Sequence, residues 1–256
     1  MPRLHHFARA KLASALVALM LTGCAQWPPV ASNAEQASPA ACESGNTPTD
    51  NTKLAAIEQM LNEGKFYAAI AQLDALGNVS PKAQLIRADA LRRIDREKDA
   101  QALYLNLVGS CINGRAHHGL GLLAARQGDQ GSSIDHLTQA RLALPTDARI
   151  RNDLGYALLL ADRLDDAQFE FLTALDLNPQ DNLAARNLVL LSFKRGDASK
   201  ARQLATKLGL DNNTFDRLAQ QAKSLSSAPL SNSNGSDMPL PAPIAPAASG
   251  PGVKSS

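Results

Sequence analysis

The sequence predicts an all-α fold, a right-handed α-solenoid of about five stacked helix pairs followed by a capping helix. The first reason is composition: hydrophobic residues make up 45% of the 256 residues, but aromatic residues only 4%. Most of the apolar residues are Ala and Leu, the strongest helix formers, whereas β-rich domains depend on Val, Ile, Thr and aromatic residues. Three cysteines are too few for a disulfide-rich miniprotein.

A repeat with a period of 34 residues is the second reason. The recurring pairs are Leu120-Gly121 with Leu154-Gly155, Ala140 with Ala174, and Pro145 with Pro179. Helix–turn–helix units have this period, and at least three must stack to bury a shared core. We expect units at 50–80, 81–113, 114–147, 148–181 and 182–215, with a terminal helix at 215–225 that covers the last exposed face.

The turn inside each unit has its own signal. Gly64, Gly128 and Gly196 lie between the two helices of their units, and Asp162 lies at the matching place in the unit 148–181. Glycine accommodates a left-handed turn, and an Asp that follows it can cap the second helix. Small residues are also expected where two helix backbones approach closely, at Gly121, Gly155, Ala100 and Ala167.

The unit 148–181 resembles the tetratricopeptide repeat. The matching residues are Leu154, Gly155, Ala167, Phe171, Ala174 and Pro179, whereas Arg151 and Leu158 replace the Trp and Tyr of the repeat pattern. With the neighbouring units, the resemblance covers about two-thirds of the chain. It implies that the first helices of successive units line a groove that binds protein partners.

The groove positions of the family give a set of candidate partner-binding residues. They are Arg115, His118, Leu122 and Arg126 in unit 114–147, Arg149, Asn152 and Tyr156 in unit 148–181, and Arg186, Asn187, Leu190 and Lys194 in unit 182–215. Arginine binds carboxylates bidentately, so this set would suit an acidic peptide or a free carboxylate. The alternative is an ordinary solvated basic face.

We expect no enzyme, no cofactor, no metal site, no nucleic-acid partner and no small-molecule substrate. Gly119-x-Gly121-x-x-Ala124 matches a dinucleotide fingerprint only as a string, since it lies within an expected helix. His117 and His118 are adjacent and near Cys111, but neighbouring residues on a helix point about 100° apart. We therefore expect one histidine to face the groove and the other to face inward.

The first 23 residues read as a secretory signal, with three basic residues, no acid, and a short apolar run from Leu12 to Leu21. Leu21-Thr22-Gly23-Cys24 resembles the lipobox of bacterial lipoproteins, which implies that Cys24 becomes the acylated first residue. Ala25 in place of Asp implies the outer membrane, facing the periplasm. The alternative is a cleaved signal without lipidation. Removing the signal changes the formal net charge from +2 to −1.

Two segments flank the repeats. Residues 24–49 are expected to form a lipidated flexible linker, and residues 226–256, rich in Pro, Ala and Ser, a disordered tail. The expected repeat domain is 50–225. Cys42 and Cys111 would form a disulfide in an oxidising periplasm, the alternative being two reduced thiols.

The segment from Asn152 to Ala167, followed by Leu175-Asp-Leu-Asn-Pro179, resembles the TadD lipoproteins of the Flp/Tad (tight adherence) pilus systems. The resemblance implies a pilotin-like scaffold whose partners are the outer-membrane secretin or other Tad pilus assembly proteins. Two alternatives stay open. One is a scaffold of another secretion, pilus or outer-membrane assembly system, and the other is an adaptor for periplasmic peptidoglycan enzymes or proteases.

Overall fold

The computed structural model describes residues 47–77, 79–180 and 182–227, and all the regular secondary structure within them is helical. The helix pairs are α2 (Pro48–Asn62) with α3 (Phe66–Leu76), α4 (Pro81–Arg93) with α5 (Glu97–Leu107), α6 (Asn113–Arg126) with α7 (Gln130–Ala143), α8 (Ala148–Leu160) with α9 (Leu164–Leu177), and α10 (Asn182–Lys194) with α11 (Ala198–Lys207). A last helix, α12 (Asn212–Ser227), follows them. The all-α prediction is confirmed.

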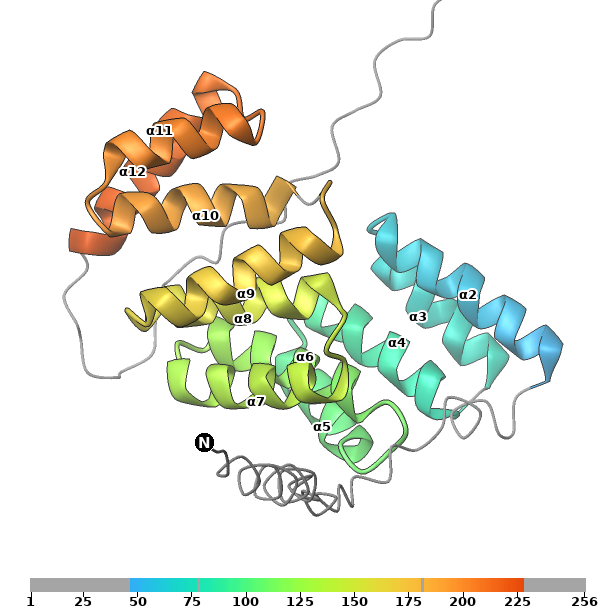
Figure 1. The fold of residues 1–256 in the computed structure, drawn as a ribbon. Helices are drawn as coiled ribbons and strands as arrows, with labels where there is room; N and C mark the ends of the chain where they lie inside the picture. Colours follow the sequence, from blue (N-terminus) through green and yellow to red (C-terminus); the bar gives the residue numbers. More distant parts are fainter. Residues whose placement is uncertain (1–46, 78, 181, 228–256) are drawn as a thin grey trace, which may run out of the picture. The chain divides into compact units, whose positions relative to one another are not determined.

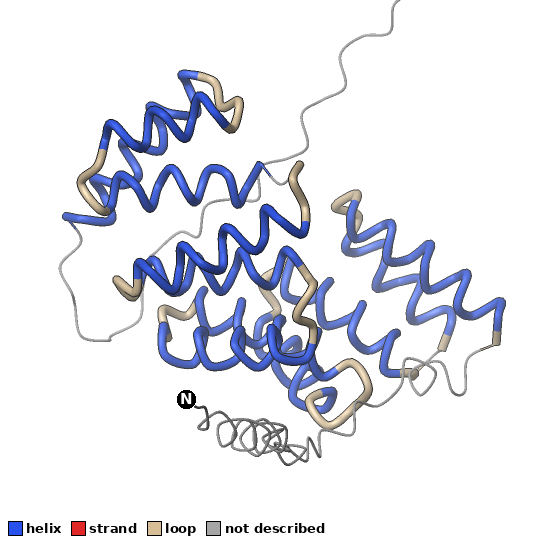
Figure 2. The backbone as a smooth tube through the Cα atoms, in the orientation of Figure 1, coloured by secondary structure: helices blue, strands red, loops and turns tan. Residues whose placement is uncertain are grey.

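The pairs stack in the order of the sequence. The first helix of each pair packs mainly against the second helix of the pair before it, so contacts run between neighbours along the chain (Figure 1). Short loops join the helices (Figure 2). This arrangement is that of an α-solenoid, in which each unit buries its apolar side chains against the adjacent units. The expected signal, most of the linker and most of the tail lie outside the described residues, as do Cys24 and Cys42.

Left-handed residues make the turn inside all five pairs. Their φ angles are 75° at Gly64, 61° at Asp95, 76° at Gly128, 58° at Asp162 and 78° at Gly196. Four of these positions were predicted from the sequence, whereas Asp95 was not. Asp is among the few residues other than glycine that adopt this conformation with any frequency.

Caps then start two of the second helices as predicted. The Asp129 carboxylate accepts a hydrogen bond from the Ser132 amide at 3.0 Å, and that of Asp197 accepts one from the Lys200 amide at 2.8 Å. Each cap satisfies a backbone N–H that has no partner within its own helix.

The predicted small residues lie at helix crossings. A Cβ atom added at Gly121 would come within 2.7 Å of Leu137 Cγ, and one added at Gly155 within 2.7 Å of Phe171 Cδ1. Ala100 and Ala167 are fully buried. Gly119 serves the same purpose, since a Cβ there would overlap the Tyr104 ring. Packing therefore explains both glycines of the dinucleotide-like string.

An ion pair takes the place of the missing aromatic in the unit 148–181. Arg151 Nη1 donates to Glu170 Oε2 at 2.9 Å, which joins α8 to α9, and Arg151 Nε donates to the Pro145 carbonyl at 3.0 Å. Arg141 Nε on α7 lies 3.5 Å from Glu170 Oε1. The side chains of Glu170 and Arg151 are only 7% and 11% exposed, so this contact belongs to the packed interior.

The last helix is placed differently from the prediction. α12 runs along α10 and makes far fewer contacts with α11. A further unit would instead have packed against α11, as α10 packs against α9. Phe215 of α12 lies against Phe193 of α10, with ring centroids 5.1 Å apart. Thus α12 covers a side of α10 rather than the end of the stack.

Candidate functional site

The first helices of four pairs, α4, α6, α8 and α10, lie side by side through direct polar contacts. Arg126 Nη1 of α6 donates to the Arg92 carbonyl of α4 at 3.3 Å. His118 Nε2 of α6 lies 2.7 Å from Asp153 Oδ2 of α8, and Asn187 Nδ2 of α10 donates to Asn152 Oδ1 of α8 at 2.8 Å. We call the surface of these four helices, from Arg92 to Arg186, the first-helix face. It contains all the candidate partner-binding residues.

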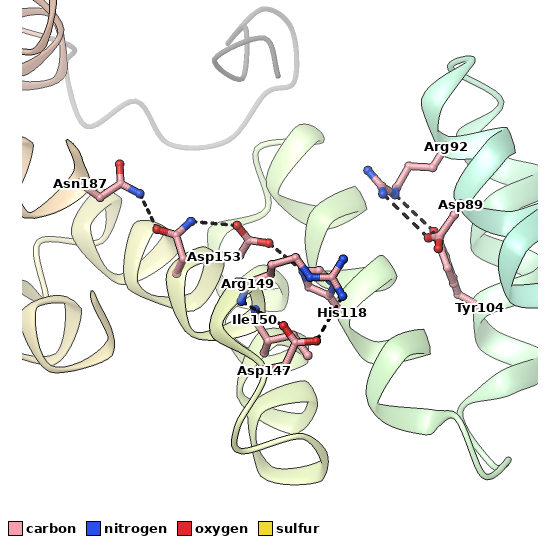
Figure 3. Close-up of polar contacts among 10 residues, drawn as sticks. Asp89, Arg92, Tyr104, His118, Asp147, Arg149, Ile150, Asp153 and Asn187 are labelled. Atoms are coloured by element: carbon pink, nitrogen blue, oxygen red, sulfur yellow. Dashed lines mark hydrogen bonds and ion pairs between the residues drawn. The ribbon is translucent and has the colours of Figure 1, made fainter. Parts of the chain in front are cut away.

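A chain of polar side chains crosses the middle of this face (Figure 3). Asn187 donates to Asn152, and Asn152 Nδ2 donates to Asp153 Oδ1 at 3.3 Å, next to His118. Asn152 and Asn187 are only 2% and 6% exposed. A buried amide is costly unless it is hydrogen-bonded, so these two candidates hold the helices together. His118 and Asp153 are the more exposed members of the chain.

Carboxylates accompany most of the cations on this face. The pairs are Arg115 with Glu58 at 3.6 Å, Arg126 with Asp95 at 2.6 Å and Glu97 at 3.5 Å, Arg149 with Asp147 at 3.3 Å, and Lys194 with Asp162 at 2.8 Å. The face is therefore mixed in charge, whereas the repeat positions alone indicated a basic surface. Exposed ion pairs are worth only about 0–1 kcal/mol, so a partner's carboxylate can replace the internal one at small cost.

Arg149 is the most exposed of these paired cations, at 67% of its side chain. Its partner Asp147 caps α8 and accepts from the backbone amides of Arg149 and Ile150 at 3.0 and 3.4 Å. Burial opposes ionisation of Asp147, but the hydrogen bond and charge of Arg149 outweigh it and lower the pKa of the carboxyl. The anion stays formed and keeps Arg149 at the helix start (Figure 3).

Arg186 is the exception among the candidate cations. Within the described part of the chain it forms no ion pair, and its Nε is buried with no hydrogen-bond partner. A guanidinium group that has lost water without gaining an acceptor is unfavourable. Arg186 is therefore the candidate with the most to gain from an acidic partner.

Three residues near α4 belong to this face and its support but were missed as candidates. The Tyr104 hydroxyl donates to Asp89 Oδ1 at 2.5 Å, and Arg92 Nε donates to that hydroxyl at 3.3 Å (Figure 3). Burial, and then the Asp89 charge, raise the pKa of Tyr104, so its hydroxyl stays protonated. Arg92 precedes Arg126 by 34 residues, so the repeat period could have identified it.

At the other end of the face, α12 covers two candidates. Leu190 is fully buried, and Gln221 Nε2 of α12 donates to the Tyr156 hydroxyl at 3.4 Å. Both residues belong to the apolar cluster that includes Phe215, Leu218 and Ala222 of α12. Leu122, farther along on α6, is half-buried.

The two adjacent histidines point in different directions, as expected. His118 meets Asp153 on the first-helix face, whereas His117 Nδ1 lies 3.1 Å from His136 Nδ1 on α7. In the described residues no three His, Cys, Asp or Glu side chains are grouped so that they could hold a metal ion. Cys111 is disulfide-bonded. Because Cys42 lies outside the described residues, the pairing of these two cysteines stays a prediction.

None of the described helices is both long enough and apolar enough to cross a membrane.

Comparison with known proteins identifies the family. No protein-family model matches the chain. The chain is 34% identical over 221 residues to the TPR repeat-containing protein PA4299 of Pseudomonas aeruginosa, an alignment that covers 86% of this chain and 87% of the relative.

Two solved structures share the fold at lower identity. The structure of pilF from Pseudomonas aeruginosa has a TM-score of 0.55 at 20% identity and covers 69% of this chain and 86% of that one. MamA from Desulfovibrio magneticus has a TM-score of 0.50 at 18% identity and covers 65% and 94%. Given the stacked helix pairs and a relative matched over most of both lengths, the chain belongs to the tetratricopeptide (TPR) repeat-containing proteins.

Proposed function

We propose that the protein is a non-enzymatic scaffold that acyl chains on Cys24 anchor in the outer membrane, facing the periplasm. It assists assembly of the Flp/Tad pilus by binding the outer-membrane secretin, or another Tad assembly protein, in a pilotin-like role. The observation that carries the proposal is the combination of Leu21-Thr22-Gly23-Cys24 with five tetratricopeptide helix pairs in one short chain. The anchor confines the array to a membrane surface, and the array offers a large surface for protein contacts.

The first-helix face is the surface on which we place the partner. Arg186 lacks an acceptor and Arg149 is exposed, and both sit beside the polar chain of His118 and Asp153. Guanidinium groups bind carboxylates in a bidentate fashion. An acidic segment or the free carboxyl terminus of the partner has the chemistry that these side chains recognise.

Co-purification tests the face. Reversing both charges with Arg149→Asp and Arg186→Asp is expected to reduce recovery of the secretin with the purified protein by about tenfold or more, as loss of a charge-assisted contact predicts. Arg163→Asp is the matched control, because Arg163 is exposed in the α8–α9 turn and pairs only locally with Asp166. Equal loss in the control and the double variant would remove the first-helix face from the proposal.

The anchor and the pilus role are tested in cells. A Cys24→Ser chain should incorporate no palmitate analogue and should leave the outer-membrane fraction. Deletion of the gene should abolish Flp fibres and reduce secretin multimers. Loss of fibres with normal secretin multimers would remove the pilotin part of the proposal. Intact fibres with altered peptidoglycan turnover would favour the adaptor for peptidoglycan enzymes instead.

A further inference from the structure

The position of α12 is unusual for a helix that follows five stacked pairs. In the regular stack a new helix packs chiefly on the second helix of the preceding pair, but α12 lies along the first helix, α10, and reaches α8 through Tyr156. It therefore leaves most of α11 uncovered and occupies one end of the first-helix face.

One side of α12 provides the contact. Phe215, Leu218 and Ala222 are 7%, 6% and 6% exposed, and their spacing of three and four residues places them on the same side of a helix. Gln221 adds the hydrogen bond to Tyr156. The opposite side carries Asp216, Gln220 and Lys223, which are exposed. Thus α12 has the form of an amphipathic helix bound in an apolar seat.

The seat coincides with positions that the repeat assigns to partner binding. Tyr156 and Leu190 occupy the same place in successive units, 34 residues apart. Both contact the apolar cluster formed with α12. The side chains that would contact a partner on α8 and α10 are therefore already in use by the chain's own helix.

Few polar contacts hold α12 in this seat. Besides the Gln221–Tyr156 bond, Arg202 Nη1 donates to Asn212 Oδ1 at 3.2 Å, and the Arg202 guanidinium lies over the Phe215 ring at 3.5 Å. The link from α11 to α12 is Leu208 to Asp211. Such a short tether gives the helix a high effective concentration, so it can be retained even when its intrinsic affinity is modest.

We propose that the surface of α8 and α10 around Tyr156 and Leu190 is a docking site for an amphipathic helix of a partner protein, and that α12 fills this site until the partner displaces it. The partner helix presents an aromatic residue, with apolar residues three and seven positions later and an amide side chain at the sixth. The proposal rests on the proposed binding of proteins by the first-helix face, but not on the partner being a pilus component.

Peptide binding to the full mature chain tests the site. The probe is a fluorescent synthetic peptide with the sequence of residues 211–227. Leu218→Glu places a charge in the apolar seat and should release α12, so the variant should bind the peptide about tenfold more tightly than the wild type does, because the tethered competitor is gone. Gln220→Glu makes the same charge change on the exposed side of α12 and should bind like the wild type. A peptide that itself carries Leu218→Glu should not bind.

Hydrogen exchange on the unmodified chain guards against a variant that fails to fold. Excess peptide should speed amide exchange in α12 and leave exchange in α6 and α7 unchanged. Exchange in α12 that ignores the peptide, or equal peptide affinity in all three chains, would overturn the proposal. A wild-type dimer in light scattering that the peptide dissociates would assign the seat to α12 of a second copy and would also overturn it. Secretin capture is not measured here, so failure of the pilus role leaves this result readable.

Discussion

The two ends of the first-helix face differ in what covers them. Around His118 and Asp153 on α6 and α8, the surface is polar and lies open beside the exposed Arg149. Around Leu190 on α10, the surface is apolar and lies under α12. Both ends are built from the same repeat positions. The difference shows that the repeat sets where a side chain points, whereas the residue type and the rest of the chain decide whether it is available.

The two ends share one frame, the packing of α8 on α9, and Glu170→Ala should weaken it most. Truncation leaves Arg151, 11% exposed, without its partner, and removing one member of a buried pair costs about 3–5 kcal/mol. Urea unfolding of the mature chain measures the loss. Glu170→Gln, which keeps an acceptor for Arg151, should lose less. Equal stability of all three chains would mean that the ion pair does not support the frame.

Leu190→Ala should separate the two ends. Leu190 is fully buried in the cluster that includes α12, and truncating a buried leucine costs about 2–5 kcal/mol. Because the cavity forms under α12, we expect faster amide exchange in α12 and little change around His118. The comparison fails if exchange accelerates equally at both ends.

Asn187→Ala should have a smaller effect, at the boundary between the ends. It leaves the Asn152 carbonyl oxygen without its 2.8 Å hydrogen bond, and an unsatisfied buried acceptor costs about 1–3 kcal/mol. Arg149→Ala, at an exposed pair, should change the unfolding free energy by less than about 1 kcal/mol yet weaken partner capture. If Arg149→Ala proved the more destabilising of the two, the division into structural amides and binding cations would be wrong.

Acidification should have the smallest effect. Burial, and then the nearby His136, lower the pKa of His117. A depressed histidine pKa means that the unfolded chain takes up the proton first, so stability falls as the pH drops below about 6.5 and levels off below the folded pKa. His117→Gln should flatten this part of the pH–stability curve, which urea titrations between pH 7.5 and 5 would measure, with roughly half-unit steps. An unchanged curve would contradict the assignment to His117.

Local pattern was sufficient for most of the fold. The five pairs, the turns at Gly128 and Gly196, and the close packing at Gly121 and Gly155 each depend on a few residues at fixed spacing. Asp95 was missed because a left-handed turn built on Asp has a weaker sequence signal than one built on Gly.

Contacts between distant residues could not be predicted in this way. The carboxylates that neutralise the face come from other elements, as with Glu58, which lies on α2 and meets Arg115 of α6. The bond from Gln221 to Tyr156 spans 65 positions and follows no repeat. The burial of Asn152 and Asn187 likewise depends on how α8 and α10 approach each other. Spacing placed these residues on the face, but only their neighbours determine whether they can bind a partner.

Site-specific photo-cross-linking in intact cells tests the central claim most directly. A photoreactive residue at Arg149, on the first-helix face, is compared with one at Phe169, which is 62% exposed on the second helix α9. We predict a secretin adduct, or an adduct to another Tad assembly protein, from position 149 and none from position 169. The same adducts from both positions, or adducts only from position 169, would contradict the account.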